Sequence, residues 1–231
     1  MKTCEEWSLE FDLLYNNIAS DKAPGLNEYE KSVFLTRAQE TIVVALYKGS
    51  LGDSFESTEE AIAYLDVLVK QADCVKADKQ VALISSYSTV FQNPEDLLFR
   101  TWEGCKIHVA NCGDVDAQVI PVTQDEYWRT IRNPFKGPNN RKVLRLAYAT
   151  GSAEGSDWYG KTGYSELVSK APIVSYTVRY VAHPEPIILT DLPDGLSING
   201  VSVSNTCKLD EALHHTILTE AVRLAKAAWA A

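Results

Sequence analysis

The amino-acid sequence predicts an α+β fold, in which helices from both chain termini form one layer and a large β-rich insertion forms a second lobe. Apolar residues recur at helical spacing through the first 78 residues and again near the C-terminus. Between them, short β-branched and aromatic runs alternate with turn residues. The expected division is 1–78 and 208–231 for the helical layer, and 79–207 for the β-rich lobe with one short helix. With 231 residues, 45% of them hydrophobic, the chain is long enough to bury a core.

The N-terminal region is predicted to contain three amphipathic helices. The first spans about 7–18, and the second spans about 28–47. Asn27 and Glu30 have the spacing of a capping box at the start of the second helix. A third helix follows a loop rich in glycine and serine. Its apolar positions recur at helical spacing: Ala61, Leu65, Leu68 and Ala72.

The middle of the chain is predicted to form short strands. The candidate strands are 81–85, 98–102, 105–110, 117–122, 143–149, 173–181, 187–190 and 196–203. Asn199-Gly200 lies between apolar residues and predicts a tight hairpin turn. One short helix, about 124–131, interrupts the strands, and Thr123 and Glu126 have the spacing of a capping box before it.

The last predicted helix, about 210–229, carries two neighbouring apolar stripes. An apolar arc this broad packs on more than one side within its own fold, or against another subunit. If a second subunit covers it, the oligomer-packing residues are Leu213, Ile217, Leu218, Val222, Leu224 and Trp229.

Charge is distributed unevenly along the chain. The formal net charge is −9, which argues against a general nucleic-acid binder with a basic surface. Residues 1–78 hold 15 acids and 7 bases, whereas 129–145 hold six bases and no acid. Two prolines indicate that this basic segment is a stiff loop. Its bases are Arg129, Arg132, Lys136, Arg141, Lys142 and Arg145.

The basic segment has two interpretations. One is a solvated basic turn without a partner. The other is a docking element for an acidic surface, either a partner protein or the acidic helical half of a neighbouring copy, in a head-to-tail contact of the kind that closes into rings. Direct contact with DNA is a weaker alternative, because the rest of the chain repels phosphate.

Cysteine and histidine patterns give little support for a metal site. Cys105, His108 and Cys112 have a spacing that a structural zinc site can use, but Cys105 and His108 lie an odd number of residues apart on a predicted strand and so face opposite sides. His214 and His215 are adjacent in a helix and point about 100° apart. We expect one of these two histidines to be buried with a hydrogen bond and the other to be exposed. We expect no metal and no cofactor.

The segment Gly155–Thr162 reads GSDWYGKT and matches the spacing of a phosphate-binding loop. Its context does not fit, because no apolar strand leads into it and Asp157, Trp158 and Tyr159 obstruct a cradle of backbone amides. A nucleotide-binding enzyme built on this segment is the enzymatic alternative to a protein without catalytic residues, and the context of the segment argues against it.

Several stretches resemble a virion structural protein of crAss-like phages, the short-tailed phages of gut Bacteroidales. They are FDLLYNNI at 11–18, APGLNEYEKSVFLTRAQE at 23–40 and PVTQDEYWRTIRNPFKGP at 121–138, with further similarity over 178–192 and 210–229. These strings are specific to the family and carry no catalytic chemistry. The resemblance therefore implies a family and not an enzymatic mechanism.

The resemblance implies a ring or adaptor component of the head–tail connector, stacked below the portal in a homo-oligomeric ring of about twelve copies. Its partners would be the portal and the neighbouring tail or ring proteins, with no membrane. Packaged DNA would pass through the lumen without specific binding, which an acidic surface favours. The protein would be made in the host cytoplasm and reside in the neck or tail of the virion. A head-decoration or internal cargo protein is the alternative within the same family.

Overall fold

The computed structural model describes residues 2–16, 25–49, 59–77, 88–110, 112–148, 163–193 and 195–230. The chain divides into two compact units. The helical unit comprises Met1–Leu68 and His183–Ala231, and the sheet unit comprises Val69–Ala182. Helices at both termini and a large β-rich middle confirm the predicted α+β class.

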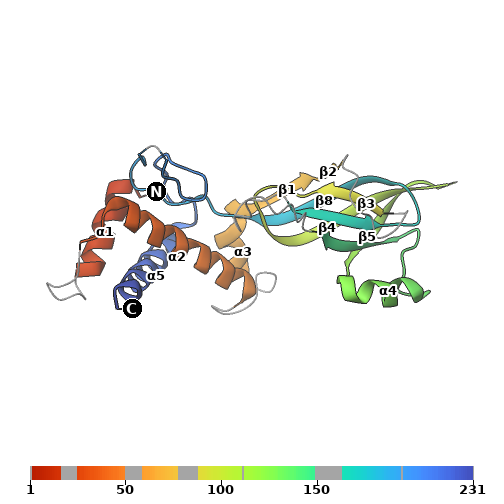
Figure 1. The fold of residues 1–231 in the computed structure, drawn as a ribbon, viewed down its shortest axis with the longest axis horizontal. Helices are drawn as coiled ribbons and strands as arrows, with labels where there is room; N and C mark the ends of the chain where they lie inside the picture. Colours follow the sequence, from red (N-terminus) through yellow and green to blue (C-terminus); the bar gives the residue numbers. More distant parts are fainter. Residues whose placement is uncertain are drawn as a thin grey trace. The chain divides into compact units, whose positions relative to one another are not determined.

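The helical unit contains α1 (Cys4–Asn16), α2 (Glu28–Lys48), α3 (Glu59–Leu65) with the short 3-10 helix η1 (Asp66–Leu68), and α5 (Glu211–Ala230). α5 packs against both α1 and α2, and these three helices lie together in Figure 1. Their shared core is formed by fully buried side chains, including Trp7, Phe11, Leu35, Ile217 and Leu218.

Local signals place the start of α2 where the sequence predicted it. The side chain of Asn27 accepts a hydrogen bond from the Glu30 backbone N–H at 2.8 Å, and the Glu30 carboxylate accepts one from the Asn27 backbone N–H at 2.9 Å. The predicted capping box is thus confirmed, and it satisfies two backbone donors that the first turn of a helix leaves unpaired.

The segment that leads from the sheet back to α5 is irregular and is fastened to α2 by hydroxyl groups. The Thr36 hydroxyl donates to the Ile187 carbonyl at 3.2 Å and accepts from its N–H at 3.1 Å, and Ser32 accepts from the Leu189 N–H at 3.0 Å. The strands predicted over 187–190 and 196–203 are therefore wrong, since this region has only isolated bridges.

The predicted tight turn within this segment is confirmed. Ile198 and Val201 exchange backbone hydrogen bonds of 2.9 and 3.0 Å. Asn199 and Gly200 between them have φ angles of 51° and 81°, the left-handed pair that a two-residue turn requires.

The third helix is shorter than its apolar spacing predicted. The α-helix ends at Leu65 and η1 ends at Leu68, and Val69–Asp73 instead forms β1, which pairs antiparallel with β8 (Ile173–Ala182). Leu68 and Ala72 are four residues apart, a spacing that suits one face of a helix and equally one face of a strand. The boundaries between the two units accordingly differ from those expected after residue 78 and before residue 208. The strands begin at residue 69, and the segment from 183 onward packs on α2.

The sheet unit contains eight strands within the described residues, in the order β1-β8-β4-β5-β6-β7-β3-β2. All neighbours pair antiparallel except β5 and β6, which are parallel. β1 and β2 are consecutive in the chain and are joined by Cys74, so the two ends of the strand order are halves of one segment and the sheet closes on itself. The remaining bounds are β2 (Val75–Lys76), β3 (Ser88–Gln92), β4 (Leu97–Val109), β5 (Gly113–Pro121), β6 (Lys142–Tyr148) and β7 (Tyr164–Val168).

The predicted strands in this unit were mostly correct in place but not in extent. The two candidates 98–102 and 105–110 form the single strand β4, which bends at register shifts along its pairing with β8. The candidates 117–122, 143–149 and 173–181 correspond to β5, β6 and β8. The candidate 81–85 lies outside the described residues, and the sequence did not predict β3 or β7.

The sheet unit has two separate cores. The inner core lies within the closed sheet and includes Ile107, Val143, Leu167 and Tyr176. The outer core lies beneath α4 (Gln124–Arg132) and is formed by Tyr127, Leu144, Leu146 and Val168. Figure 1 shows α4 outside the sheet. The predicted helix is confirmed, although Thr123 occupies the cap position without the expected side-chain hydrogen bond.

Candidate assembly surfaces

Most of the predicted basic segment lies on α4 and the turns that follow it. Arg129, Arg132, Lys136 and Arg141 are exposed. Arg129 pairs with Glu126 at 2.7 Å in a contact that solvent screens on both sides, since the two side chains are 80% and 50% exposed. Lys142 is half-buried, and its ammonium donates to a backbone carbonyl at 3.3 Å.

Arg145 lies apart from the rest of the segment, inside the closed sheet. Its Nε is 2.8 and 3.0 Å from the two carboxylate oxygens of Glu103, and the side chains are only 13% and 11% exposed. Tyr176 donates its hydroxyl to the same carboxylate at 2.5 Å, and Arg100 lies 3.4 Å from it. Burial and the Glu103 carboxylate raise the pKa of Tyr176 well above its ordinary value. Arg145 therefore serves an interior ion pair and adds nothing to the exposed basic surface.

Two aromatic residues that the sequence reasoning did not single out lie among these bases. Trp128 is 60% exposed and Phe135 is 86% exposed. The helical period accounts for the exposure of Trp128, because Tyr127 is buried against the sheet and the next residue points about 100° away. We call the exposed residues Trp128, Arg129, Arg132, Phe135, Lys136 and Arg141 the α4 basic surface.

The apolar stripes of α5 are largely covered within the helical unit itself. Leu213, Ile217, Leu218 and Val222 are between 0% and 7% exposed and form part of its core. Leu224 is half-buried. The side chain of Trp229 lies outside the part of the chain that the structure describes. Packing within one chain thus accounts for the breadth of the arc at the four buried positions.

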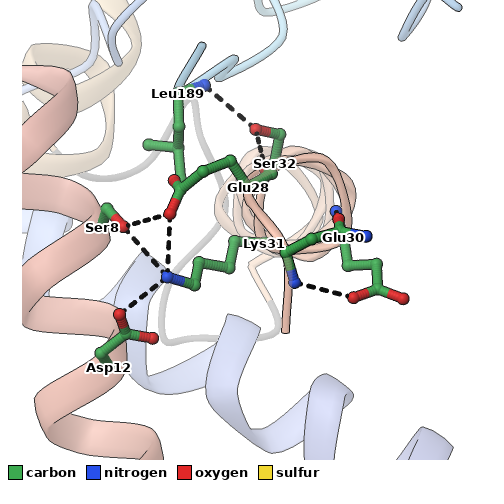
Figure 2. Close-up of polar contacts among 8 residues, drawn as sticks. Ser8, Asp12, Glu28, Glu30, Lys31, Ser32 and Leu189 are labelled. Carbon is green, nitrogen blue, oxygen red and sulfur yellow. Dashed lines mark hydrogen bonds and ion pairs between the residues drawn. The ribbon is translucent and has the colours of Figure 1, made fainter. Parts of the chain in front are cut away.

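A buried lysine joins α1 to α2. Lys31 is 4% exposed, and its Nζ lies 2.7 Å from Asp12, 3.0 Å from Glu28 and 3.1 Å from the Ser8 hydroxyl, as Figure 2 shows. Burial alone would lower the pKa of Lys31, but the hydrogen bonds and charges of Asp12 and Glu28 outweigh it, so the pKa is raised. The lysine thereby neutralises two of the acids in the acidic N-terminal region.

The neighbouring face of α1, about 100° around the helix from Ser8 and Asp12, is exposed and apolar. Leu9 and Leu13 are each 64% exposed and lie one helical turn apart, with Glu5 and Glu6 exposed in the preceding turn. A groove of about 380 Å³ lies beside Leu9 and extends to Glu28 and Leu189. We call Glu5, Glu6, Leu9 and Leu13 with this groove the α1 face.

The candidate metal ligands do not converge. On β4, Cys105 is buried and His108 is exposed, with its Nδ1 2.8 Å from Asp114, and Cys112 is exposed. Burial raises the pKa of Cys105 to about 12. Among the residues described, no three histidine, cysteine or acidic side chains are placed to hold a metal ion. The segment Gly155–Thr162 lies outside the described residues.

The adjacent histidines of α5 behave as expected. His214 is 1% exposed and bonds through Nε2 to the Leu209 carbonyl at 3.2 Å, whereas His215 is exposed. The ring of His214 also lies 5.0 Å from that of Trp7, between centroids. Burial lowers the pKa of His214, so the imidazole is held in its neutral form. The prediction of one buried and one exposed histidine is confirmed.

Comparison with known proteins decides the family. A family model described as Phage tail ring protein 3/4 matches residues 1–231. The chain belongs to this family. It is similar to Ring protein 3 of Bacteroides phage crAss001, with 39% identity over 229 residues, covering 96% of this chain and 94% of the relative. It is also similar to Ring protein 4/5 of the same phage, with 34% identity over 233 residues, covering 97% and 92%.

These matches confirm the resemblance to structural proteins of crAss-like phages. As a member of this tail ring family, the chain is a phage structural protein. The names of both relatives describe ring components, and neither names an enzymatic activity. None of the described helices is both long and apolar enough to cross a membrane.

Proposed function

We propose that this protein assembles into a ring in the head–tail connector of a crAss-like phage, around the channel through which packaged DNA passes. The match to the tail ring family across residues 1–231 carries the proposal. Both relatives are named ring proteins and align over more than nine-tenths of their own length. The proposed ring holds about twelve copies and contacts the portal and the neighbouring ring or tail proteins.

The acidic composition supports the part of the proposal that concerns DNA. With a net charge of −9, the protein as a whole repels phosphate rather than condensing on it. A lumen lined by such a surface lets the genome slide. We therefore expect no saturable binding of the full-length chain to duplex DNA at physiological salt in a fluorescence anisotropy titration.

Electron microscopy of the full-length protein, alone and mixed with purified portal, tests the proposal directly. We expect closed rings with a central channel, and ring density in the neck or tail of intact virions. A protein that stays monomeric with the portal present would overturn the ring. Density on the capsid surface or inside the head would instead identify a decoration or cargo protein.

The α4 basic surface is the proposed docking element of the assembly. Arg141 is exposed at the turn before β6, whereas Lys142 begins that strand and binds a backbone carbonyl. Arg141→Glu is therefore the cleaner substitution, and it should impair assembly while the far-ultraviolet circular dichroism spectrum stays unchanged. Intact assembly of this variant would argue that the turn is simply solvated.

A further inference from the structure

The α4 basic surface has the composition of a binding hot spot. Trp128 and Phe135 are large, exposed aromatic side chains with arginine and lysine residues on either side. Tryptophan, tyrosine and arginine dominate the energetics of protein interfaces, and aromatic anchors there fill pockets on the partner. The turn that presents Phe135 is also pre-organised, because Asn133 accepts a hydrogen bond from the Phe135 N–H at 2.9 Å through its side chain. Its backbone carbonyl accepts a second bond, at 3.2 Å, from the Lys136 N–H.

The charge of this surface is not neutralised within the chain's described residues. Asp125 and Glu126 lie in the first turn of α4, and Glu126 compensates Arg129. Arg132, Lys136 and Arg141 have no ion pair with any residue that the structure describes. The surface around Phe135 is therefore cationic and fits an acidic partner.

The α1 face has the complementary properties. Leu9 and Leu13 provide an exposed apolar stripe, and Glu5 and Glu6 provide negative charge at one end of it. The groove beside Leu9 is large enough to admit one aromatic side chain, and no basic residue lines it. Of the two carboxylates in its lining, Glu28 is already paired with Lys31 at 3.0 Å, so Glu5 carries the negative charge that a partner meets there. An aromatic anchor flanked by bases is the ligand that such a groove suits.

We propose that the α4 basic surface of one copy binds the α1 face of the next copy. In this contact Phe135 occupies the groove beside Leu9, and Arg132 and Lys136 lie against the carboxylates of α1. The contact rests on the proposed ring function and names the surfaces that build it.

A second copy of this chain is the occupant that the two surfaces favour. They are different patches of the same chain with opposite charge, so their contact is heterologous and repeats from copy to copy, and such a contact closes into a ring when the rotation between copies permits. Exposed aromatics among bases can also bind single-stranded DNA, but the net charge of −9 opposes this.

Apolar substitutions test the anchor and its groove. Phe135→Ser and Leu9→Ser should each raise the concentration of half-assembly by at least about tenfold in sedimentation velocity of the full-length protein, the loss typical of a hot-spot residue. Val174→Ser is the matched control, because Val174 is 52% exposed on β8 and belongs to neither surface. Unchanged circular dichroism and thermal unfolding would show that each variant is folded.

A charge exchange tests the pairing itself. Arg132→Glu and Glu5→Arg should each weaken assembly, and the double variant should recover most of the loss, because the two opposite charges are restored in exchanged positions. Lys106→Glu, at an exposed position on β4, is the control for a general effect of net charge. Additive losses in the double variant would contradict direct pairing.

The outcomes separate this contact from the ring function. If the unmodified chain forms rings and Phe135→Ser forms them equally well, the contact is wrong and the ring function stands. Phe135→Ser could instead assemble normally but lose binding to the portal or to a neighbouring ring protein. In that case the α4 basic surface has a different protein as its partner, and the proposed contact is again overturned. An unmodified chain that never assembles removes the ring and this contact together.

Discussion

Replacing Arg145 with methionine should destabilise the sheet unit by about 2–4 kcal/mol. The substitution leaves the Glu103 carboxylate inside the closed sheet, where both side chains are less than 15% exposed. Breaking a buried ion pair by removing one partner costs about 3–5 kcal/mol. The carboxylate retains the Tyr176 hydroxyl at 2.5 Å and Arg100 at 3.4 Å, which reduces the expected loss to about 2–4 kcal/mol.

Equilibrium urea unfolding of the full-length chain, followed by circular dichroism, measures this loss. Arg141→Met is the matched control, since it removes the same cation from an exposed position and should change the free energy of unfolding by less than about 0.5 kcal/mol. Glu103→Gln should also be costly, because it removes the carboxylate charge that the buried Arg145 guanidinium contacts at 2.8 Å. Equal effects of Arg145→Met and Arg141→Met would refute the interior assignment of Arg145.

Three further predictions concern the rest of the fold. Lys31→Met should lower the free energy of unfolding by only about 1–2 kcal/mol, because the carboxylates of Asp12 and Glu28 are about 40% exposed and regain water; a loss above about 4 kcal/mol would contradict this. Since burial lowers the pKa of His214, the unfolded chain takes up a proton below about pH 6.5 that the folded chain resists, so stability should fall as the pH drops from 7 to 5, and His214→Gln should flatten that fall in urea titrations. Cys112, exposed in the turn before β5, should be the first thiol that iodoacetamide modifies in the native protein, as mass spectrometry of the labelled peptides would show; earlier labelling of a buried cysteine would count against the described fold.

The sequence predicted elements well where the signal is local. The capping box of α2, the period of α5 and the Asn199-Gly200 turn each depend on a few neighbouring residues. β1 depends instead on β8, which lies about a hundred residues further along the chain, and its register pairs Val69 with Val181. The predicted strand at 187–190 failed because hydroxyl groups of α2, such as that of Thr36, take the backbone hydrogen bonds that a neighbouring strand would otherwise take.

The α4 basic surface was predicted only in part, again because residues far apart in the sequence decide which charges are paired. A count of charges finds the bases of 129–145, but it does not reveal which side chains have interior partners. Alternation along β6 puts Arg145 on the same side as buried Val143, and that signal was present in the sequence. Its partner Glu103 lies on β4, so only the closed sheet brings the two together.

Charged side chains that form ion pairs inside the fold and exposed ones without an ion pair among the described residues therefore affect different properties of the protein. Lys31 and Arg145 are cations that neutralise carboxylates inside their own units. Removing either should therefore lower the free energy of unfolding and leave assembly largely unchanged. Arg132 and Lys136 have no ion-pair partner among the described residues. Reversing their charge should therefore weaken assembly and leave the free energy of unfolding largely unchanged. A variant series that measured both quantities would distinguish these two roles, and it would do so even where the net charge changes by the same amount in every variant.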